Sequence, residues 1–321
     1  YCSRGERQFS ISPLVVYLVV RDMDWSALSV ELRDFPLRYA IASLLIFSVA
    51  TAVRAYRWQV LFVGEKVPLH RLLLVQNAGI GLNSLSPIRL ISEAAQYVLL
   101  TLRYQVKKES VAATLGVQRV LDFVISALLL GIGFILLPGL KGFALYILGA
   151  EFLAILSLLA IPAIIWFGAR PGLARVPMLA STAASLRRLL QARLKLTWSF
   201  LLTLIYWLIL GLAAWVLAYG MGIEISLLLA TLLVIATLTF VALVPSLPAS
   251  IGTFEFAAYY LLTAFGVGPM EALGYALALH AILFLPPILV ALLVMISWTL
   301  KKRAKEAGAP ATGESPPVSS A

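Results

Sequence analysis

Apolar stretches long enough to cross a bilayer as helices recur along this chain, and they constrain its fold more than any other feature. The candidate spans are residues 37–62, 111–137, 143–168, 196–219 and 272–300. A transmembrane helix needs about 20 predominantly apolar residues. A shorter run, 9–20, is interpreted as a clipped or tilted first span, which gives about six spans. The sequence predicts an all-α polytopic membrane protein, and its 12% of charged residues excludes an ordinary soluble enzyme, in which about 25% is typical.

Basic residues gather in particular loops and indicate the orientation. Segment 170–195 carries six Arg and Lys residues and no acidic residue, and the tail begins with Lys301, Lys302 and Arg303. Such loops are typical of the cytoplasmic side. The net charge of +10 therefore indicates membrane topology rather than a nucleic-acid partner. We expect a multi-pass protein of the cell membrane with a cytoplasmic C-terminus.

Two further apolar stretches, 72–102 and 227–265, are interrupted near their middle by Pro, Ser, Asn or Gly. The loop charges place both ends of the first stretch inside and both ends of the second outside. Each stretch must then enter and leave on one face. Broken backbone at membrane depth is tolerated only where protein or a watery cavity covers it. We therefore expect two re-entrant helical hairpins that enter from opposite faces.

The two hairpins share a sequence pattern. EAAQYVLL at 93–100 and EFAAYYLL at 255–262 are identical at five of eight positions. Each hairpin follows two spans and precedes one, which is the layout of inverted-repeat transporters. The sequence predicts one membrane domain over residues 1–300, with halves at about 9–137 and 143–300. Residues 301–321 are predicted to be a disordered cytoplasmic tail.

The candidate binding residues are polar side chains at membrane depth, which usually mark a pathway or a pairing, and the Pro and Gly residues that free backbone groups at the breaks. The candidates are Asn83, Ser84, Ser86, Pro87, Arg89 and Glu93 at the first break, Arg119 and Asp122 in the span after it, and Pro245, Pro248, Gly252 and Glu255 at the second break.

The roles of these residues stay open at this level. Glu93 and Glu255 either bind a ligand or only cap the second helix of their hairpins. Arg89 pairs with Glu93 or binds a lipid phosphate. Arg119 and Asp122 form an ion pair with each other or line a cavity.

Three other polar residues in the spans are given unremarkable roles. Arg54 and Arg57 lie near a cytoplasmic helix end, where the default expectation is that the side chains reach toward lipid headgroups. His280 lies inside the last span, where a packing role is favoured over a proton relay.

Signals of catalysis are missing from the sequence. The chain has one cysteine and two distant histidines, and it lacks a phosphate-binding G-x-x-x-x-G-K-[ST] loop. We expect no catalytic residues, no metal, no cofactor and no enzymatic activity.

Three motifs in order resemble the transmembrane region of lysylphosphatidylglycerol synthases. An Asn-rich stretch followed by Pro, Arg and Gly-Glu is matched by Asn83, Pro87, Arg89 and Glu93. A Pro-Gly-x-x-Gly-x-x-Glu pattern appears at residues 248–255, and a Glu-Arg-x-x-Asp pattern at residues 118–122. The chain departs from the family at Ser92 and Ala249, which stand where the family has Gly, at Gln118, which replaces Glu, and at Gln96, near an expected second Arg.

The resemblance implies that the protein handles membrane lipids. In the family, this region is associated with moving aminoacylated phospholipid between leaflets. Some relatives are joined to glycosyltransferases that use polyprenol-linked sugars, so the resemblance also allows a polyprenol-linked lipid. About twenty residues follow residue 300, too few for a synthase domain, so we expect translocation rather than synthesis. The alternatives are a membrane-embedded transferase acting on a lipid carrier, and a non-catalytic partner of a lipid-modifying enzyme or glycosyltransferase.

Overall fold

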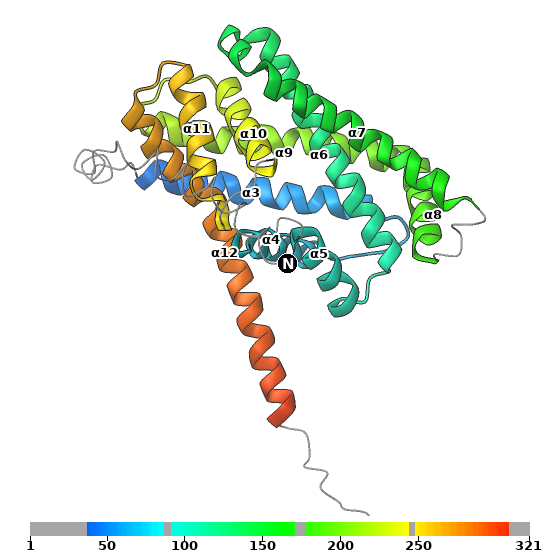
Figure 1. Ribbon diagram of the computed structural model, residues 1–321. Coiled ribbons are helices and arrows are strands. Elements are labelled where there is room, and N and C mark those ends of the chain that lie inside the picture. Colours follow the sequence, from blue (N-terminus) through cyan, green and yellow to red (C-terminus); the bar gives the residue numbers. More distant parts are fainter. Residues whose placement is uncertain (1–36, 87–90, 171–176, 244–247, 308–321) are drawn as a thin grey trace, which may run out of the picture.

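The computed structural model describes residues 37–86, 91–170, 177–243 and 248–307, and all regular structure in these ranges is helical (Figure 1). The longer helices are α3 (Leu37–Leu61), α6 (Lys108–Leu136), α7 (Ala144–Gly168), α9 (Arg193–Gly220) and α12 (Pro269–Ala307). The shorter helices are α4 (Leu69–Leu85), α5 (Ile91–Val98), α8 (Pro177–Gln191), α10 (Leu227–Leu243) and α11 (Thr253–Ala264). A π-helical turn, η1 (Leu99–Arg103), extends α5, while 3₁₀ turns η2 (Pro138–Phe143) and η3 (Pro248–Ser250) precede α7 and α11.

Five helices in the described part of the chain are long and apolar enough to cross a membrane. They are α3, α6, α7 together with η2 from Gly139 onward, α9, and α12 up to Leu300. These helices match the five longer candidate spans, so the polytopic all-α fold is confirmed. The candidate span at 9–20 lies outside the described residues, as does most of the predicted tail.

Both interrupted stretches are broken helices. α4 and α10 have 17 residues each, or about 26 Å at 1.5 Å per residue, which is short of the roughly 30 Å hydrocarbon core. α5 and α11 follow the breaks and pack on α4 and α10 respectively. The predicted breaks are confirmed, whereas entry from opposite membrane faces stays a prediction.

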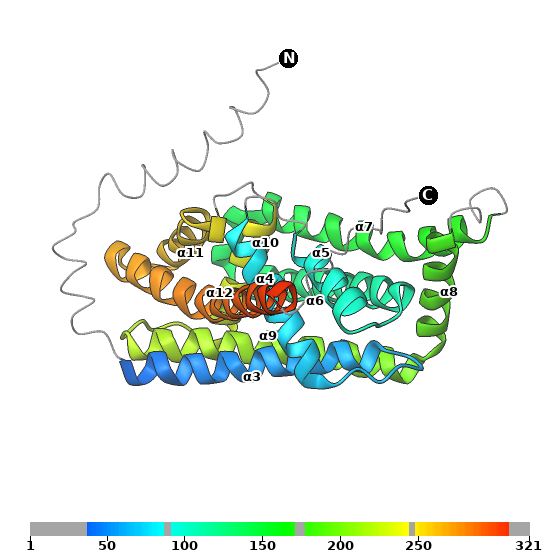
Figure 2. The same ribbon diagram turned by 90° about the horizontal axis from the view of Figure 1, so that it is seen from below.

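The two halves predicted from the sequence contact each other through corresponding helices. α4 of the first half packs on α12 of the second, and α10 of the second half packs on α6 of the first. α3 and α9, which stand in corresponding positions of the two halves, lie side by side along the molecule (Figure 2). Reciprocal contacts of this kind are expected of two similar units related by a two-fold axis, and the inverted repeat itself stays a prediction.

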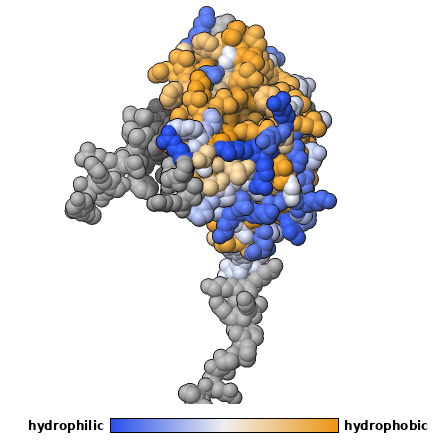
Figure 3. Space-filling view, turned by 90° about the vertical axis from the view of Figure 1, so that its right-hand side faces the viewer, coloured by the Kyte–Doolittle hydropathy of each residue, from blue (hydrophilic) through white to orange (hydrophobic). Residues whose placement is uncertain are grey.

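The outer surface is strongly apolar over the spans. On α7, Leu145 is 86% exposed, and Leu148 and Phe152 are each 65% exposed. Figure 3 shows a continuous hydrophobic area on one side of the molecule, next to a hydrophilic region. Soluble proteins rarely expose such large apolar patches, whereas this surface suits contact with lipid.

Helix α12 bends within the membrane-spanning part of the protein. Pro286 and Pro287 lie inside it, and proline removes a helical hydrogen bond and clashes with the preceding turn. Figure 1 shows the end of α12 projecting away from the bundle. Near these prolines the Pro287 carbonyl lies against Gly81 of α4, where an added Cβ would lie 2.0 Å from the oxygen.

Candidate functional site

A cavity of about 500 Å³ lies where the two helix breaks meet. Its walls come from both halves, because α3, α4, α5 and α6 of the first half and α9, α10, η3 and α12 of the second contribute side chains. The polar lining residues are Arg54, Asn83, Ser84, Ser86, Ser92, Glu93, Arg119, Asp122, Ser126, Tyr206, Thr239 and Ser250. Apolar side chains such as Phe123, Trp207 and Phe284 complete the lining.

The structure brings together half of the residues singled out from the sequence. Those that line the cavity are Asn83, Ser84, Ser86, Glu93, Arg119 and Asp122. Pro248 and Gly252 flank Ala249 and Ser250, which line the wall at the second break. Pro87, Arg89 and Pro245 lie outside the described residues. Glu255 does not line the cavity.

Glu93 forms an ion pair with Arg119, from Oε1 to Nη2. Glu93 lies in the first turn of α5, where a carboxylate is also favoured by the helix dipole. The side chains of Glu93 and Arg119 are 29% and 43% exposed. Glu93 Oε1 itself is buried, so water or a ligand can reach the other atoms of the pair. The alternative pairing of Glu93 with Arg89 lies outside the described residues.

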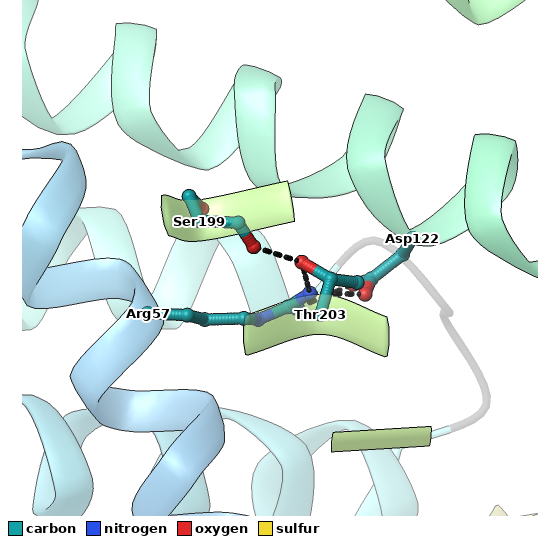
Figure 4. Close-up of polar contacts among 4 residues, drawn as sticks. All are labelled: Arg57, Asp122, Ser199 and Thr203. Atoms are coloured by element: carbon teal, nitrogen blue, oxygen red, sulfur yellow. Dashed lines mark hydrogen bonds and ion pairs between the residues drawn. The ribbon is translucent and has the colours of Figure 1, made fainter. Parts of the chain in front are cut away.

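Asp122 pairs with Arg57 rather than with Arg119. Arg57 Nη1 donates to Asp122 Oδ1 at 2.6 Å, and Nη2 donates to Oδ2 at 2.8 Å. Nη1 also donates to Thr203 Oγ1 at 2.9 Å, and that hydroxyl donates to the Ser199 carbonyl at 2.6 Å (Figure 4). The pair therefore joins α3, α6 and α9 through the bidentate geometry that suits a guanidinium and a carboxylate.

The structure decides one open alternative and corrects one interpretation. Arg119 and Asp122 both line the cavity and do not pair with each other, because each residue has an ion-pair partner on another helix. The assignment of Arg57 to the headgroup region is wrong, because its side chain is 0% exposed. α6 and α9 close over this part of α3, and the carboxylate on α6 compensates the buried charge.

Arg54 is the cavity cation without a carboxylate partner in the described part of the protein. It is half-buried, and its guanidinium carbon lies 5.5 Å from the centre of the Tyr206 ring. Its buried Nε has no hydrogen-bond partner. The three arginines at the site, Arg54, Arg57 and Arg119, face two carboxylates, so the described side chains leave a surplus of one positive charge.

Glu255 lies behind the wall of the cavity. Its Oε2 accepts a hydrogen bond from the Gly252 backbone N–H at 2.7 Å, which is a helix cap. Its Oε1 lies 2.5 Å from His280 Nδ1, and His280 Nε2 lies 2.8 Å from the Ala249 carbonyl. The capping interpretation of Glu255 fits these contacts.

Sequence reasoning missed several cavity residues. Tyr206, Thr239 and Ser126 gave no signal, because single hydroxyl groups in apolar helices are common. Arg54 did offer a signal, because Arg54 and Arg57 are three residues apart and so share a helix face. In the structure both guanidinium groups reach the same Tyr206 ring, but only Arg54 lines the cavity. Across the four described ranges, no group of three or more His, Cys, Asp or Glu residues could hold a metal ion.

Comparison with known proteins identifies a family. The family model described as the lysylphosphatidylglycerol synthase TM region matches residues 8–291. This match extends over both halves and includes every described residue that lines the cavity. No significant match was found among curated proteins or among solved structures.

Proposed function

Because the chain belongs to the lysylphosphatidylglycerol synthase transmembrane region family, we propose that it translocates a phospholipid between the two leaflets of the membrane. Family membership supports an integral membrane protein with a lipid-related role. In our proposal the headgroup passes through the cavity, while the acyl chains stay in the bilayer. An aminoacylated phospholipid or a polyprenol-linked lipid is the expected substrate.

The observation that carries this proposal is the meeting of both helix breaks at one charged cavity. Ionised side chains are costly within a membrane and usually serve a pathway or a binding site. Here Arg54, Glu93, Arg119 and Asp122 line one space of about 500 Å³. Ligand sites are typically about 300–1,000 Å³, so the space is suitable for a lipid headgroup.

The charges of the cavity suit a headgroup that carries a phosphate. Arg54 has no carboxylate partner among the described residues, and its planar fork matches phosphate oxygens. The partly exposed pair of Glu93 and Arg119 provides a second position at which a headgroup could bind. An amino group on the headgroup would compete with Arg119 for Glu93 and release the guanidinium for the phosphate.

Movement of the halves would expose the cavity to each side in turn. Inverted-repeat transporters rock one repeat against the other around a fixed central site. The long contact between α3 and α9 provides a pivot. The basic loops favour a cytoplasmic C-terminus in the plasma membrane.

Translocation can be tested in proteoliposomes that contain fluorescent, headgroup-labelled phosphatidylglycerol or fluorescent lysylphosphatidylglycerol. A membrane-impermeant reductant bleaches the outer leaflet, so lipid that moves outward loses its fluorescence. We expect the wild type to accelerate this loss over empty liposomes and Arg54→Gln to slow it for both lipids. Glu93→Gln should slow lysylphosphatidylglycerol more than phosphatidylglycerol.

Arg38→Gln is the matched control, because Arg38 lies on the same helix, at its exposed start, and outside the cavity lining. Equal rates in wild-type, Arg54→Gln and empty liposomes would contradict translocation of these lipids. Recovery of a chemically altered lipid would instead indicate the transferase. A purified protein that neither moves nor alters any lipid would favour the role of partner to a lipid-modifying enzyme.

A further inference from the structure

We infer that Glu255 and His280 form a proton-binding site that links proton binding to the position of the second broken helix. The coupling to lipid movement rests on the proposed translocation, whereas the proton site itself does not. The two residues come from α11 and α12, and each is less than a tenth exposed. The sequence suggested a packing role for His280, but its contacts show two directed polar interactions.

The hydrogen-bond partners determine how many protons the pair holds. A carbonyl oxygen only accepts, so His280 Nε2 must carry a hydrogen and donate it to Ala249 at 2.8 Å. Oε2 of Glu255 accepts from the Gly252 N–H. The 2.5 Å contact between Nδ1 and Oε1 needs one hydrogen, supplied either by the imidazolium or by the carboxylic acid. In both cases the pair is neutral overall and shares a single proton.

The surroundings of the pair penalise any other number of protons. The imidazole stacks on Phe254, with ring centres 4.8 Å apart, and meets Phe284 edge-on at 4.5 Å. A second proton would make the pair positive and loss of the proton would make it negative. Either charge would be buried among aromatic rings, which is unfavourable without water or a counter-ion.

No other described ionisable side chain hydrogen-bonds or ion-pairs with Glu255 or His280. The helix α10 that packs on α11 has no titratable residue, and α11 itself adds only tyrosines. Helix α12 up to Leu300 adds Glu271 and Tyr275, and three other described helices pack against it. Their ionisable side chains are His70 and Arg71 on α4; Arg38, Tyr39, Arg54, Tyr56 and Arg57 on α3; and Arg193, Lys195, Tyr206 and Tyr219 on α9. None of these side chains forms a hydrogen bond, an ion pair or a ring contact with Glu255 or His280, so the charge of the pair is set by its own protons.

The pair is connected to the cavity through the Ala249 carbonyl. Ala249 and Ser250 line the cavity, and both have left-handed backbone conformations, with φ of 58° and 61°. Non-glycine residues hold such conformations only where the surrounding structure fixes them. His280 supplies one of the fixing contacts. The pair can therefore gain or lose a proton only in a conformation in which this wall has moved away and water reaches the two groups. The pH then sets how strongly that conformation is populated.

The variant Glu255→Gln distinguishes the effect of the shared proton from the effect of the hydrogen bonds. The Gln amide oxygen can still accept from Gly252, and its NH₂ group can donate to Nδ1 of a neutral imidazole. Nε2 can still donate to Ala249. The variant thus keeps every hydrogen bond of the pair but removes the shared proton, so a purely structural role predicts wild-type behaviour.

The first measurement is the pH dependence of translocation of fluorescent phosphatidylglycerol between about pH 5 and 8. We expect the wild-type rate to change by up to about tenfold per pH unit, as for a single titrating proton. Glu255→Gln should lose this dependence. Glu271→Gln, which alters an exposed acid in the first turn of α12, should retain it. Identical pH profiles for the wild type and Glu255→Gln would overturn the coupling.

The second measurement does not depend on lipid movement. The chain contains only two histidines, so His70→Gln with ¹⁵N-labelled histidine leaves His280 as the single imidazole signal. We expect its Nδ1 resonance to show a shared proton, to change with pH, and to move to that of a neutral imidazole when Glu255→Gln is added. A resonance that is constant over this pH range and unaffected by Glu255→Gln would overturn the proton site, whatever the lipid assay gives.

Discussion

Arg57 holds Asp122 through two hydrogen bonds that pair Nη1 with Oδ1 and Nη2 with Oδ2, across α3 and α6. The arginine is fully buried, while the aspartate lines the cavity and is 13% exposed. The negative charge of the Asp122 carboxylate, which faces the cavity, is thus already compensated by the buried Arg57. This arrangement leaves Arg54 and the pair of Glu93 and Arg119 as the charges available to a ligand.

Replacing Arg57 by methionine should destabilise the protein strongly. The change leaves Asp122 without its charge partner in a largely buried position, and breaking such a pair typically costs about 3–5 kcal/mol. Thermal unfolding in detergent would measure the loss. The double variant Arg57→Met/Asp122→Leu should recover most of the stability, because no lone charge remains. Equal stability of the single variant and the wild type would show that the pair is open to water.

Gly81→Ala should destabilise the contact between α4 and the bend of α12. The new Cβ would lie 2.0 Å from the Pro287 oxygen and 2.7 Å from Ala291 Cβ, and overpacking of this kind costs about 1–3 kcal/mol. Gly116→Ala on α6 is the control, since its Cβ would meet nothing within 4 Å and alanine favours helices by up to about 1 kcal/mol. The two variants should shift the unfolding temperature in opposite directions. A gain for both would mean that the helices separate easily at Gly81.

Ala249→Gly should stabilise the turn before α11. Ala249 has a φ of 58°, which costs about 1–3 kcal/mol for a residue with a Cβ, while glycine loses more backbone entropy on folding. We expect a net gain of about 1 kcal/mol in unfolding experiments. Ala184→Gly, at an exposed position within α8, should cost about 1 kcal/mol. Equal losses in both variants would contradict the left-handed turn.

Glu65→Gln should weaken the start of α6. Glu65 Oε1 accepts a hydrogen bond from Ser110 Oγ at 2.5 Å, and Oε2 accepts from the Lys107 backbone N–H at 3.3 Å. A carboxylate at a helix N-terminus also interacts favourably with the helix dipole. We expect a loss of about 1 kcal/mol in unfolding experiments. The loss of stability should be smaller at high salt. The control is Glu109→Gln in the first turn of α6, which should lower the stability less because Glu109 makes no such hydrogen bond.

The sequence predicted most of the fold because membrane spans are encoded locally. Apolar length located the five spans, and Pro, Ser and Gly located both breaks. The six described residues that converge at the cavity were identified because polar groups at membrane depth are rare. The partners of the polar residues were not identified, since Arg57 and Asp122 are 65 residues apart and Glu255 and His280, behind the cavity wall, are 25 apart. Which side chains meet depends on how the helices cross, and helix crossing leaves no local pattern.

The contact between α3 and α9 has a consequence for how the protein is made. α3 ends at Leu61, whereas α9 begins only at Arg193. Translation adds about 5–20 residues per second. The synthesis of α9, on which α3 packs, therefore begins on the order of ten seconds after α3 is complete. Its Ser43 hydroxyl, which donates to the Ala213 carbonyl, and its Arg57 side chain need temporary partners during that time. The earliest stage of biogenesis is therefore the point at which α3 depends most on the insertion machinery or on lipid headgroups.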